Sequence, residues 1–243
     1  MNSNANFSEF VSSGDLALLR LLHLADSALP IGSLAHSFGI ESLVSFEILD
    51  VRGLPNFLNG YLHETGLLEA AALREAFHLV AVAPLEFPAS RWIALNDLLS
   101  ALKPARESRA ASATLGRNFL RAVMGVEQHP VLRQAWNVSA EAESPIHQST
   151  AFGLASAALG FMEDAAVLAF LHQMTANLVS ACQRLLPLGQ TEAMRILWSL
   201  KPTMSEVCAG SAACALESAR CTTPLLDWGA MEHPALSTRL FVS

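Results

Sequence analysis

The side chains that could catalyse a reaction or bind a metal are scattered along the chain rather than grouped. Of its eight histidines, none stands three or four residues from another, the spacing that places two side chains on one helix face. One Glu-x-x-His motif occurs, from Glu75 to His78, whereas a di-iron site in a helical bundle needs two. On one helix, Cys214 and Cys221 would lie about 10.5 Å apart along the axis, too far for a disulfide bond. These spacings predict no metal or cofactor bound tightly by this chain alone.

Motifs for nucleotide binding and covalent catalysis are missing as well. The chain contains no phosphate loop of the form G-x-x-x-x-G-K-S/T, no G-x-G-x-x-G, no H-E-x-x-H and no G-x-S-x-G. Its 22 Asp and Glu residues outnumber its 15 Lys and Arg residues, for a formal net charge of −7. Because nucleic-acid binding needs a surplus of cations, this balance disfavours it. Any nucleotide chemistry would therefore belong to a partner.

A polar stripe stands out near the N-terminus. We expect a first helix to stop at Pro30 and Ser33 to cap the next one, so that Ser33, Ser37 and Glu41 share one face. Gly39 within that helix costs about 1 kcal/mol relative to alanine and indicates the close approach of another backbone. We predict that Ser37 and Glu41 face a partner; the alternative is a polar helix edge in water.

A row of cations is predicted in the middle of the chain. Lys103, Arg106, Arg109, Arg117 and Arg121 would lie within roughly a third of a helix circumference. In an acidic protein, such a row is typical of a docking surface for an acidic partner. The alternative is a solvated face with local ion pairs.

Two later segments are singled out by small or paired residues. Gly153, Ser156, Ala157 and Gly160 would line one stripe, which predicts tight packing against another helix. After the break at 187–189, Glu192 and Arg195 would share the polar face of a short helix that begins at Gln190. Such a pair adds only a few tenths of a kcal/mol to stability, so a role in partner binding is favoured.

The elements that must position these residues are helices. Apolar residues recur at helical spacing almost throughout, and prolines and glycines mark the joints. Helices are predicted over about 15–29, 55–82, 90–101, 104–123, 130–137, 144–160, 163–185, 190–200 and 202–221. No alternating strand pattern appears. The fold class is therefore all-α: a single-domain bundle of about ten helices, spanning 15–221, with a disordered N-terminal lead over 1–14.

The last stretch, 222–243, shows no helical period and is predicted to be an extended C-terminal tail. It carries His233 and ends in Arg239-Leu240-Phe241-Val242-Ser243. An apolar, aromatic end is unfavourable in water, so the tail should dock on this protein or on a partner.

A membrane location is not expected. The most apolar stretch, 151–171, is interrupted by Glu163 and Asp164, which predicts a buried helix pair rather than a span. No charged leader precedes it, since the first basic residue is Arg20, and cysteines are few. A reducing cytoplasm is the expected location.

Together, these segments resemble the UreF family of urease accessory proteins. The matching motifs are Ala25-Asp26-Ser27-Ala28-Leu29-Pro30-Ile31-Gly32-Ser33, His36-Ser37-Phe38-Gly39-Ile40-Glu41, Ala105-Arg106-Glu107-Ser108-Arg109 with Gly116-Arg117, the Gly- and Ala-rich segment from His147 to Gly160, Pro187-Leu188-Gly189-Gln190-Thr191, and Arg239-Leu240-Phe241-Val242-Ser243. Their order and spacing cover about residues 16–243.

The resemblance implies an all-helical, non-enzymatic chaperone of nickel insertion. Such a protein binds UreD, also called UreH, recruits the GTPase UreG, and meets the urease apoprotein, so that nickel is handled in transit by the complex. A homodimer would also fit the family. The residues expected to bind partners are Ser37, Glu41, Arg106, Arg109, Gln190, Glu192, Arg195, His233, Arg239, Leu240 and Phe241. Among them, Glu192 and Arg195 are the candidates for UreG, and the tail is the candidate for UreD.

Two other functions stay open on the sequence. One is a helical enzyme or small-molecule-binding protein with an internal polar pocket built around Asp26, His36 and Glu41, which would need a cavity of a few hundred Å³. The other is a self-contained nickel store, which would need tight metal binding by the isolated chain.

Overall fold

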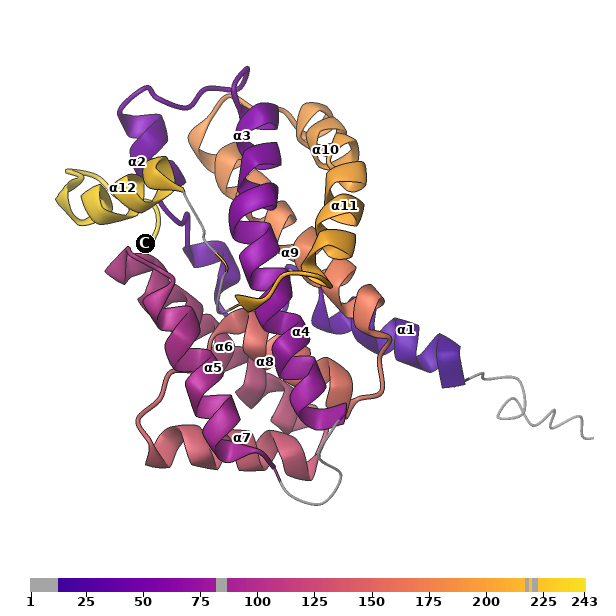
Figure 1. Cartoon of the computed structure of the whole chain (residues 1–243). Coiled ribbons are helices and arrows are strands. Elements are labelled where there is room, and N and C mark those ends of the chain that lie inside the picture. The colour runs from indigo at the N-terminus through magenta and orange to yellow at the C-terminus, as the bar shows by residue number, and fades with distance from the viewer. Residues whose placement is uncertain (1–12, 82–86, 217–218, 220–222) are drawn as a thin grey trace, which may run out of the picture.

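Helices make up the regular structure of the computed structural model, which describes residues 13–81, 87–216, 219 and 223–243 (Figure 1). No strand occurs among those residues, which confirms the predicted all-α fold. The predicted lead over 1–14 falls outside the described residues except for its last two, which begin the first helix.

The α-helices are α1 (Ser13–Leu24), α2 (Ile40–Ser45), α3 (Leu54–Tyr61), α4 (Leu67–Ala81), α5 (Ala89–Ala101), α6 (Arg106–Val126), α7 (Pro130–Glu141), α8 (Gln148–Ala158), α9 (Glu163–Leu185), α10 (Gln190–Ser199), α11 (Lys201–Ser211) and α12 (Pro224–Glu232). Two 3-10 turns accompany them, η2 (Ser33–Ala35) and η5 (His233–Ala235). A π-helical turn, η3 (Leu62–Gly66), joins α3 to α4.

The core is built on α4, α6, α8 and α9. Here Gly153 on α8 faces the backbone of Leu73 on α4, where a Cβ atom would overlap the Leu73 carbonyl oxygen. The predicted tight packing is thus confirmed at Gly153, whereas Gly160 follows the end of α8 with φ +73°, and a Cβ atom there would have open space around it. The rings of Phe119, Phe152 and Phe170 pack side by side between these helices, with centroids 5.2 and 5.5 Å apart.

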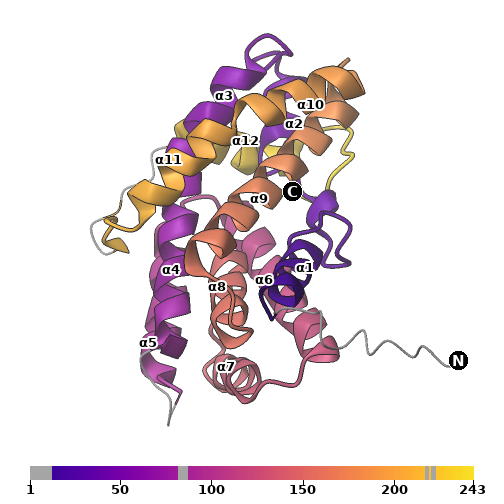
Figure 2. The same cartoon turned by 90° about the vertical axis from the view of Figure 1, so that its right-hand side faces the viewer.

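The longest helix, α9, runs between the α10–α11 pair and α1 (Figure 2). In length and apolar composition it is the one helix in the described part of the chain that could cross a membrane. Its apolar window is 61% buried against the other helices, and the chain between it and α8 turns at Gly160. The predicted helix pair over 151–171 is therefore found in the core.

Near the N-terminus, two predicted helix boundaries are wrong. α1 ends at Leu24 rather than at Pro30, because the Asp26 carboxylate accepts the Ala28 N–H at 2.8 Å and turns the chain. Ser33 does not cap a long helix but begins the single turn η2. The next α-helix starts only after Gly39, whose φ of +92° is open mainly to glycine.

Later in the chain, three further boundaries differ from the prediction. α8 begins at Gln148, since the Ser144 hydroxyl donates to Asp97 instead of capping a helix. α11 ends at Ser211, and Cys221, its predicted end, lies outside the described residues. The tail is not simply extended: its first part forms α12 and η5 because α12 packs against α2.

Candidate functional site

The C-terminal tail lies on α2 and on the loop before it, in an arrangement that we call the tail dock. The Ser37 and Phe38 amides donate to the Ser243 carbonyl oxygen at 2.5 and 3.3 Å, and the Ser37 hydroxyl donates to the same atom at 3.1 Å. The Val242 amide donates to the Ala35 carbonyl at 2.8 Å. The two segments are therefore joined by main-chain contacts, although about 200 residues separate them in sequence.

Glu41 is the centre of the tail dock. Its carboxylate is 3% exposed, and its oxygens accept the Leu240 amide at 2.6 Å and the Phe241 amide at 3.2 Å. The third partner is the His233 Nε2 atom, 2.7 Å away and equally enclosed. A buried carboxylate is tolerated only when its oxygens are this fully bonded, so Glu41 specifies where the tail lies.

Arg184, in the last turn of α9, holds the tail from the other side. Its guanidinium lies 4.2 Å from the centroid of the Phe241 ring, and it donates to the carbonyl oxygens of Leu34 at 2.9 Å and Leu240 at 3.4 Å. Sequence reasoning missed this residue. No local signal could have found it, because its role arises from contacts with two segments that are distant in sequence.

The glycines of α2 and α12 allow the two helices to cross closely. A Cβ atom at Gly39 would lie 2.6 Å from the Leu226 carbonyl oxygen, and one at Gly229 would lie 2.6 Å from the Gly39 carbonyl oxygen. The close approach predicted from Gly39 is confirmed, with α12 as the partner backbone.

The crossing of these helices leaves a group of large apolar side chains in solvent. Trp228 on α12 contacts Phe46 at the end of α2, with ring centroids 5.2 Å apart. Between 38% and 52% of each side chain in the group is exposed. We call it the α2–α12 apolar surface; it consists of Phe46, Ile48, Leu225, Trp228 and Met231.

The residues predicted to bind partners fall into three places. Ser37, Glu41, His233 and Phe241 are buried in the tail dock, so they contact the chain itself rather than the outside. The neighbouring Arg239 and Leu240 are exposed on the tail, Gln190, Glu192 and Arg195 are exposed on α10, and Arg106 and Arg109 lie at the start of α6.

On α10, the Glu192–Arg195 pair forms as predicted, at 3.2 Å, on a solvent-exposed face. The same face carries Met194, 65% exposed, and Trp198, 75% exposed. Because an isolated surface pair adds little stability, its position beside two exposed apolar side chains is the more informative observation.

The predicted row of cations does not form as one surface. Lys103 precedes α6 and forms a buried ion pair with Glu69. Arg109 is half-buried and donates to the carbonyl oxygens of Lys103 and Pro104 at 2.5 and 2.7 Å. Arg106 is exposed, while Arg117 and Arg121 stack on Trp136 of α7.

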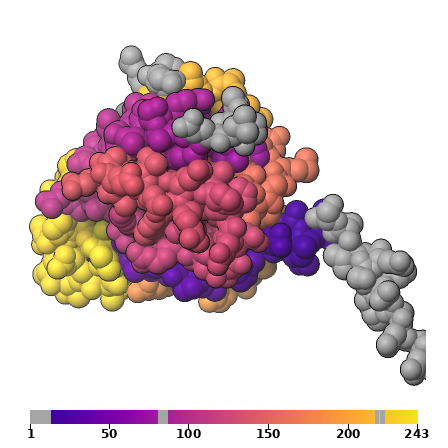
Figure 3. All heavy atoms as spheres, turned by 90° about the horizontal axis from the view of Figure 1, so that it is seen from below, coloured from indigo at the N-terminus to yellow at the C-terminus, as the bar shows by residue number. Residues whose placement is uncertain are grey.

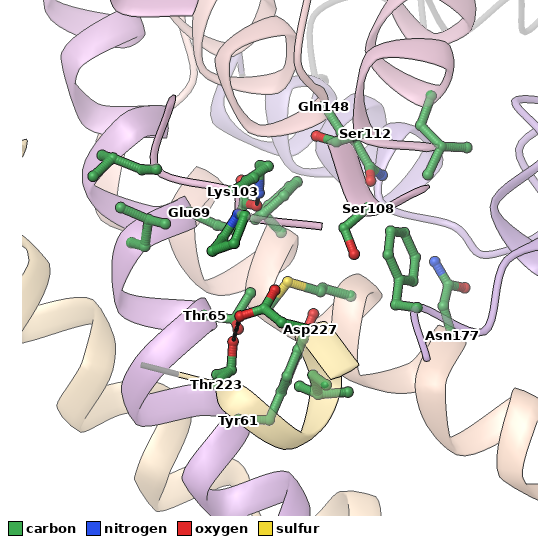
Figure 4. A pocket seen from close by; sticks show the side chains of 18 of the residues that line it. Tyr61, Thr65, Glu69, Lys103, Ser108, Ser112, Gln148, Asn177, Thr223 and Asp227 are labelled. Carbon is green, nitrogen blue, oxygen red and sulfur yellow. Dashed lines mark hydrogen bonds and ion pairs between the residues drawn. The ribbon is translucent and has the colours of Figure 1, made fainter. Parts of the chain in front are cut away.

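A small cavity among the helices is lined by apolar and polar side chains (Figure 4). It measures about 80 Å³ and is lined by Asn177, Asp227 and the Glu69–Lys103 pair, among others. Burial opposes ionisation of Glu69, but Lys103 outweighs it and lowers the pKa of that carboxyl, whereas burial raises the pKa of Asp227.

This cavity does not provide the internal pocket that a small-molecule or enzymatic function would need. Its volume is below the few hundred Å³ expected of a ligand site. None of Asp26, His36 and Glu41 lines it. Asp26 lines a larger and more open hollow of about 710 Å³ with His172 and Lys201, but His36 and Glu41 do not reach that hollow either. Among the residues that the structure describes, no three His, Cys, Asp or Glu side chains are grouped so that they could hold a metal ion.

Comparisons with known proteins match the chain to one family. The model of the family described as UreF matches residues 48–201. A protein of Nostoc sp. named "Urease accessory protein UreF" is 32% identical over 231 residues, covering 94% of this chain and 97% of the relative. Proteins of the same name are 30% identical in Bradyrhizobium diazoefficiens, over 97% of this chain and 98% of the relative, and 29% identical in Rhodopseudomonas palustris, over 93% of each.

Proposed function

This chain belongs to the UreF family of urease accessory proteins, and on that premise we propose that it is a non-catalytic scaffold for urease maturation. In the proposed cytoplasmic complex it holds UreD (UreH) and the GTPase UreG on the urease apoprotein. It controls the GTP-dependent delivery of nickel to the urease active site, and nickel passes through the complex as cargo. The chain has no phosphate loop, so the nucleotide is assigned to UreG.

The α2–α12 apolar surface is the observation that carries this proposal. It leaves five large apolar side chains, two of them aromatic, partly exposed on α12 and at or just after the end of α2, and the two aromatic rings contact each other. A group of exposed apolar side chains is typical of a protein–protein interface. We assign it to UreD together with the exposed tail residues Arg239 and Leu240. In this proposal the buried residues of the tail dock position the tail instead of touching UreD.

The exposed face of α10 is proposed as the contact for UreG. It combines Arg195, Glu192 and Gln190 with the apolar side chains of Met194 and Trp198. Large aromatic side chains next to an arginine are common energetic centres of interfaces. The two proposed interfaces use different elements, so they can be tested separately.

Deletion of residues 239–243 tests the assignment of the tail. We expect the deleted chain to lose UreD in a pull-down, and retained stoichiometric binding would remove the tail assignment. Because the deletion also opens the tail dock, a second variant leaves the dock intact: Leu225→Asp with Met231→Asp changes the two most exposed apolar side chains of α12. It should lose UreD while keeping the thermal stability of the parent.

A reciprocal variant on α10 provides the matched control. Trp198→Asp with Arg195→Glu should retain UreD and lose UreG, the opposite of the α12 variant. If both variants lost the same partner, the two surfaces would not be separate interfaces and the assignment would be wrong.

A further inference from the structure

Two arginines of α6 share one tryptophan of α7. The guanidinium carbons of Arg117 and Arg121 both lie 5.4 Å from the centroid of the Trp136 ring. They are four residues apart, so they project from successive turns of α6. Arg133, exposed on the same helix as the tryptophan, precedes it by nearly one turn. We call these four residues the twin-arginine platform.

The charges of the platform are not balanced within the chain. Over the described residues, none of its three arginines forms an ion pair, whereas Arg74, Lys103 and Arg195 each pair with a carboxylate. Like charges one turn apart repel each other, and the chain has 22 acidic residues from which partners could have been drawn. Stacking on Trp136 stabilises each arginine by only about 0.5–1 kcal/mol, and it does not neutralise the charge of either one.

The chemistry of the platform suits carboxylates. A guanidinium fork binds a carboxylate through two parallel hydrogen bonds, and stacking on an indole ring restricts the orientation of that fork. Arg121 and Arg133 are exposed and Arg117 is half-buried, so their N–H groups can be reached from solvent. Figure 3 views the end of the molecule that carries α7; the segment that includes it is covered there neither by the C-terminal tail nor by α1.

We propose that the twin-arginine platform docks an acidic segment of a protein partner, with two carboxylates bound at Arg117 and Arg121. The inference rests on the scaffold function proposed above and adds a third contact to it, separate from the α2–α12 apolar surface and from α10. A protein segment fits better than a nucleic acid or an anionic membrane. A long polyanion would be repelled by the rest of the chain, whose net charge is −7. A short acidic segment would interact only with the local cations.

The first test measures binding of a fluorescent oligoglutamate peptide to the full chain. Arg117→Glu with Arg121→Glu should weaken binding by about tenfold or more, and binding to the parent should weaken as salt is raised. Arg52→Glu with Arg91→Glu is the matched control, because it makes the same change of charge at two exposed arginines elsewhere. Equal losses in the two variants would overturn the proposal, as would tighter binding of duplex DNA or anionic vesicles than of the peptide.

The second test uses the complex with UreD, UreG and urease. The Arg117→Glu/Arg121→Glu chain should keep UreD but lose one other component or the activation of urease, with thermal stability unchanged. Wild-type stoichiometry and activation in this variant would overturn the docking proposal and leave the scaffold function standing. Failure of the unmodified chain to form any complex would instead contradict the scaffold function, and the peptide measurement would still decide the chemistry of the platform.

Discussion

At the scale of single residues, Glu41 decides where the C-terminal tail lies. It sits on α2, and its three donors come from η5 and from the end of the tail. A buried carboxylate without donors would be strongly unfavourable, so the tail and Glu41 stabilise one another. Sequence analysis picked out Glu41 from its place in a polar stripe, but it expected an outward-facing side chain.

Replacing Glu41 by alanine should open the tail dock. The change removes the acceptor of the buried His233 ring, of the buried Phe241 amide and of the partly buried Leu240 amide, which costs about 3 kcal/mol or more. Hydrogen exchange should therefore speed up at the amides of Leu240 and Phe241. Glu192→Ala is the control, because its ion pair is exposed and should change stability by less than about 1 kcal/mol. Unchanged exchange at the tail in Glu41→Ala would show that Glu41 does not hold it.

The second prediction concerns His147 and the dependence of the free energy of unfolding on pH. Its ring is buried, with Nε2 2.8 Å from the Ser100 hydroxyl and Nδ1 3.0 Å from the Ser112 hydroxyl. Burial, followed by the nearby Lys103 charge, lowers the pKa of His147 from 6.5 to about 4. Above pH 6.5 the ring is neutral in both the folded and the unfolded chain. Below it, the unfolded chain takes up a proton that the folded chain does not.

The free energy of unfolding should therefore fall as the pH drops from 6.5 towards 4, by up to about 3 kcal/mol from this residue. Urea unfolding at several pH values would measure it. In His147→Gln, stability at neutral pH falls because hydrogen bonds are lost, but the slope against pH in this window should be shallower. An identical slope in the variant would show that the folded state binds this proton normally.

At the scale of elements, the close crossing of α2 and α12 depends on two glycines, Gly39 and Gly229, because a side chain at either position would overlap the other segment. Gly39 has a positive φ, and a Cβ atom there would lie 2.6 Å from a backbone atom of α12. A side chain at this position would therefore force the backbone of one of the two helices to move. Gly39→Ala should destabilise the docked α12 by more than about 1 kcal/mol, from strain and overlap together.

Gly125→Ala provides the control for that change. Gly125 lies near the end of α6 with no other atom near the position of a Cβ, so alanine should be neutral or stabilising by up to about 1 kcal/mol. Thermal unfolding, together with protease cleavage at α12, would compare the two variants. Equal behaviour would contradict the role given to the helix crossing.

The sequence predicted best those elements whose ends are marked locally. Both ends of α9 and the start of α10 agree with the prediction, because Gly160 and the break at 187–189 punctuate them. α12 was missed because its apolar residues face both α2 and solvent, so it has no clear amphipathic period. The sequence predicted that the tail docks on this protein or on a partner, but not where on this protein, because the tail dock joins Glu41 to residues about 200 positions away.

At the scale of the whole molecule, the described residues form a helical body with a small cavity between its helices and with large apolar and charged side chains exposed on its surface. Polar groups that might have formed a reaction centre are used internally: Glu69 with Lys103, His147 with two serines, and Glu41 with the tail. The exposed groups proposed to contact partners are the α2–α12 apolar surface, the face of α10 and the twin-arginine platform. This division between a bonded interior and unpartnered surfaces is what a scaffold requires.

The central claim is that this molecule acts by assembling partners, and co-expression with UreD and UreG tests it most directly. The account predicts that a complex of all three proteins survives affinity purification and size-exclusion chromatography. It also predicts that this complex activates urease apoprotein when nickel and GTP are supplied. Absence of the three-component complex, or equal activation of urease when this chain is omitted, would contradict the account.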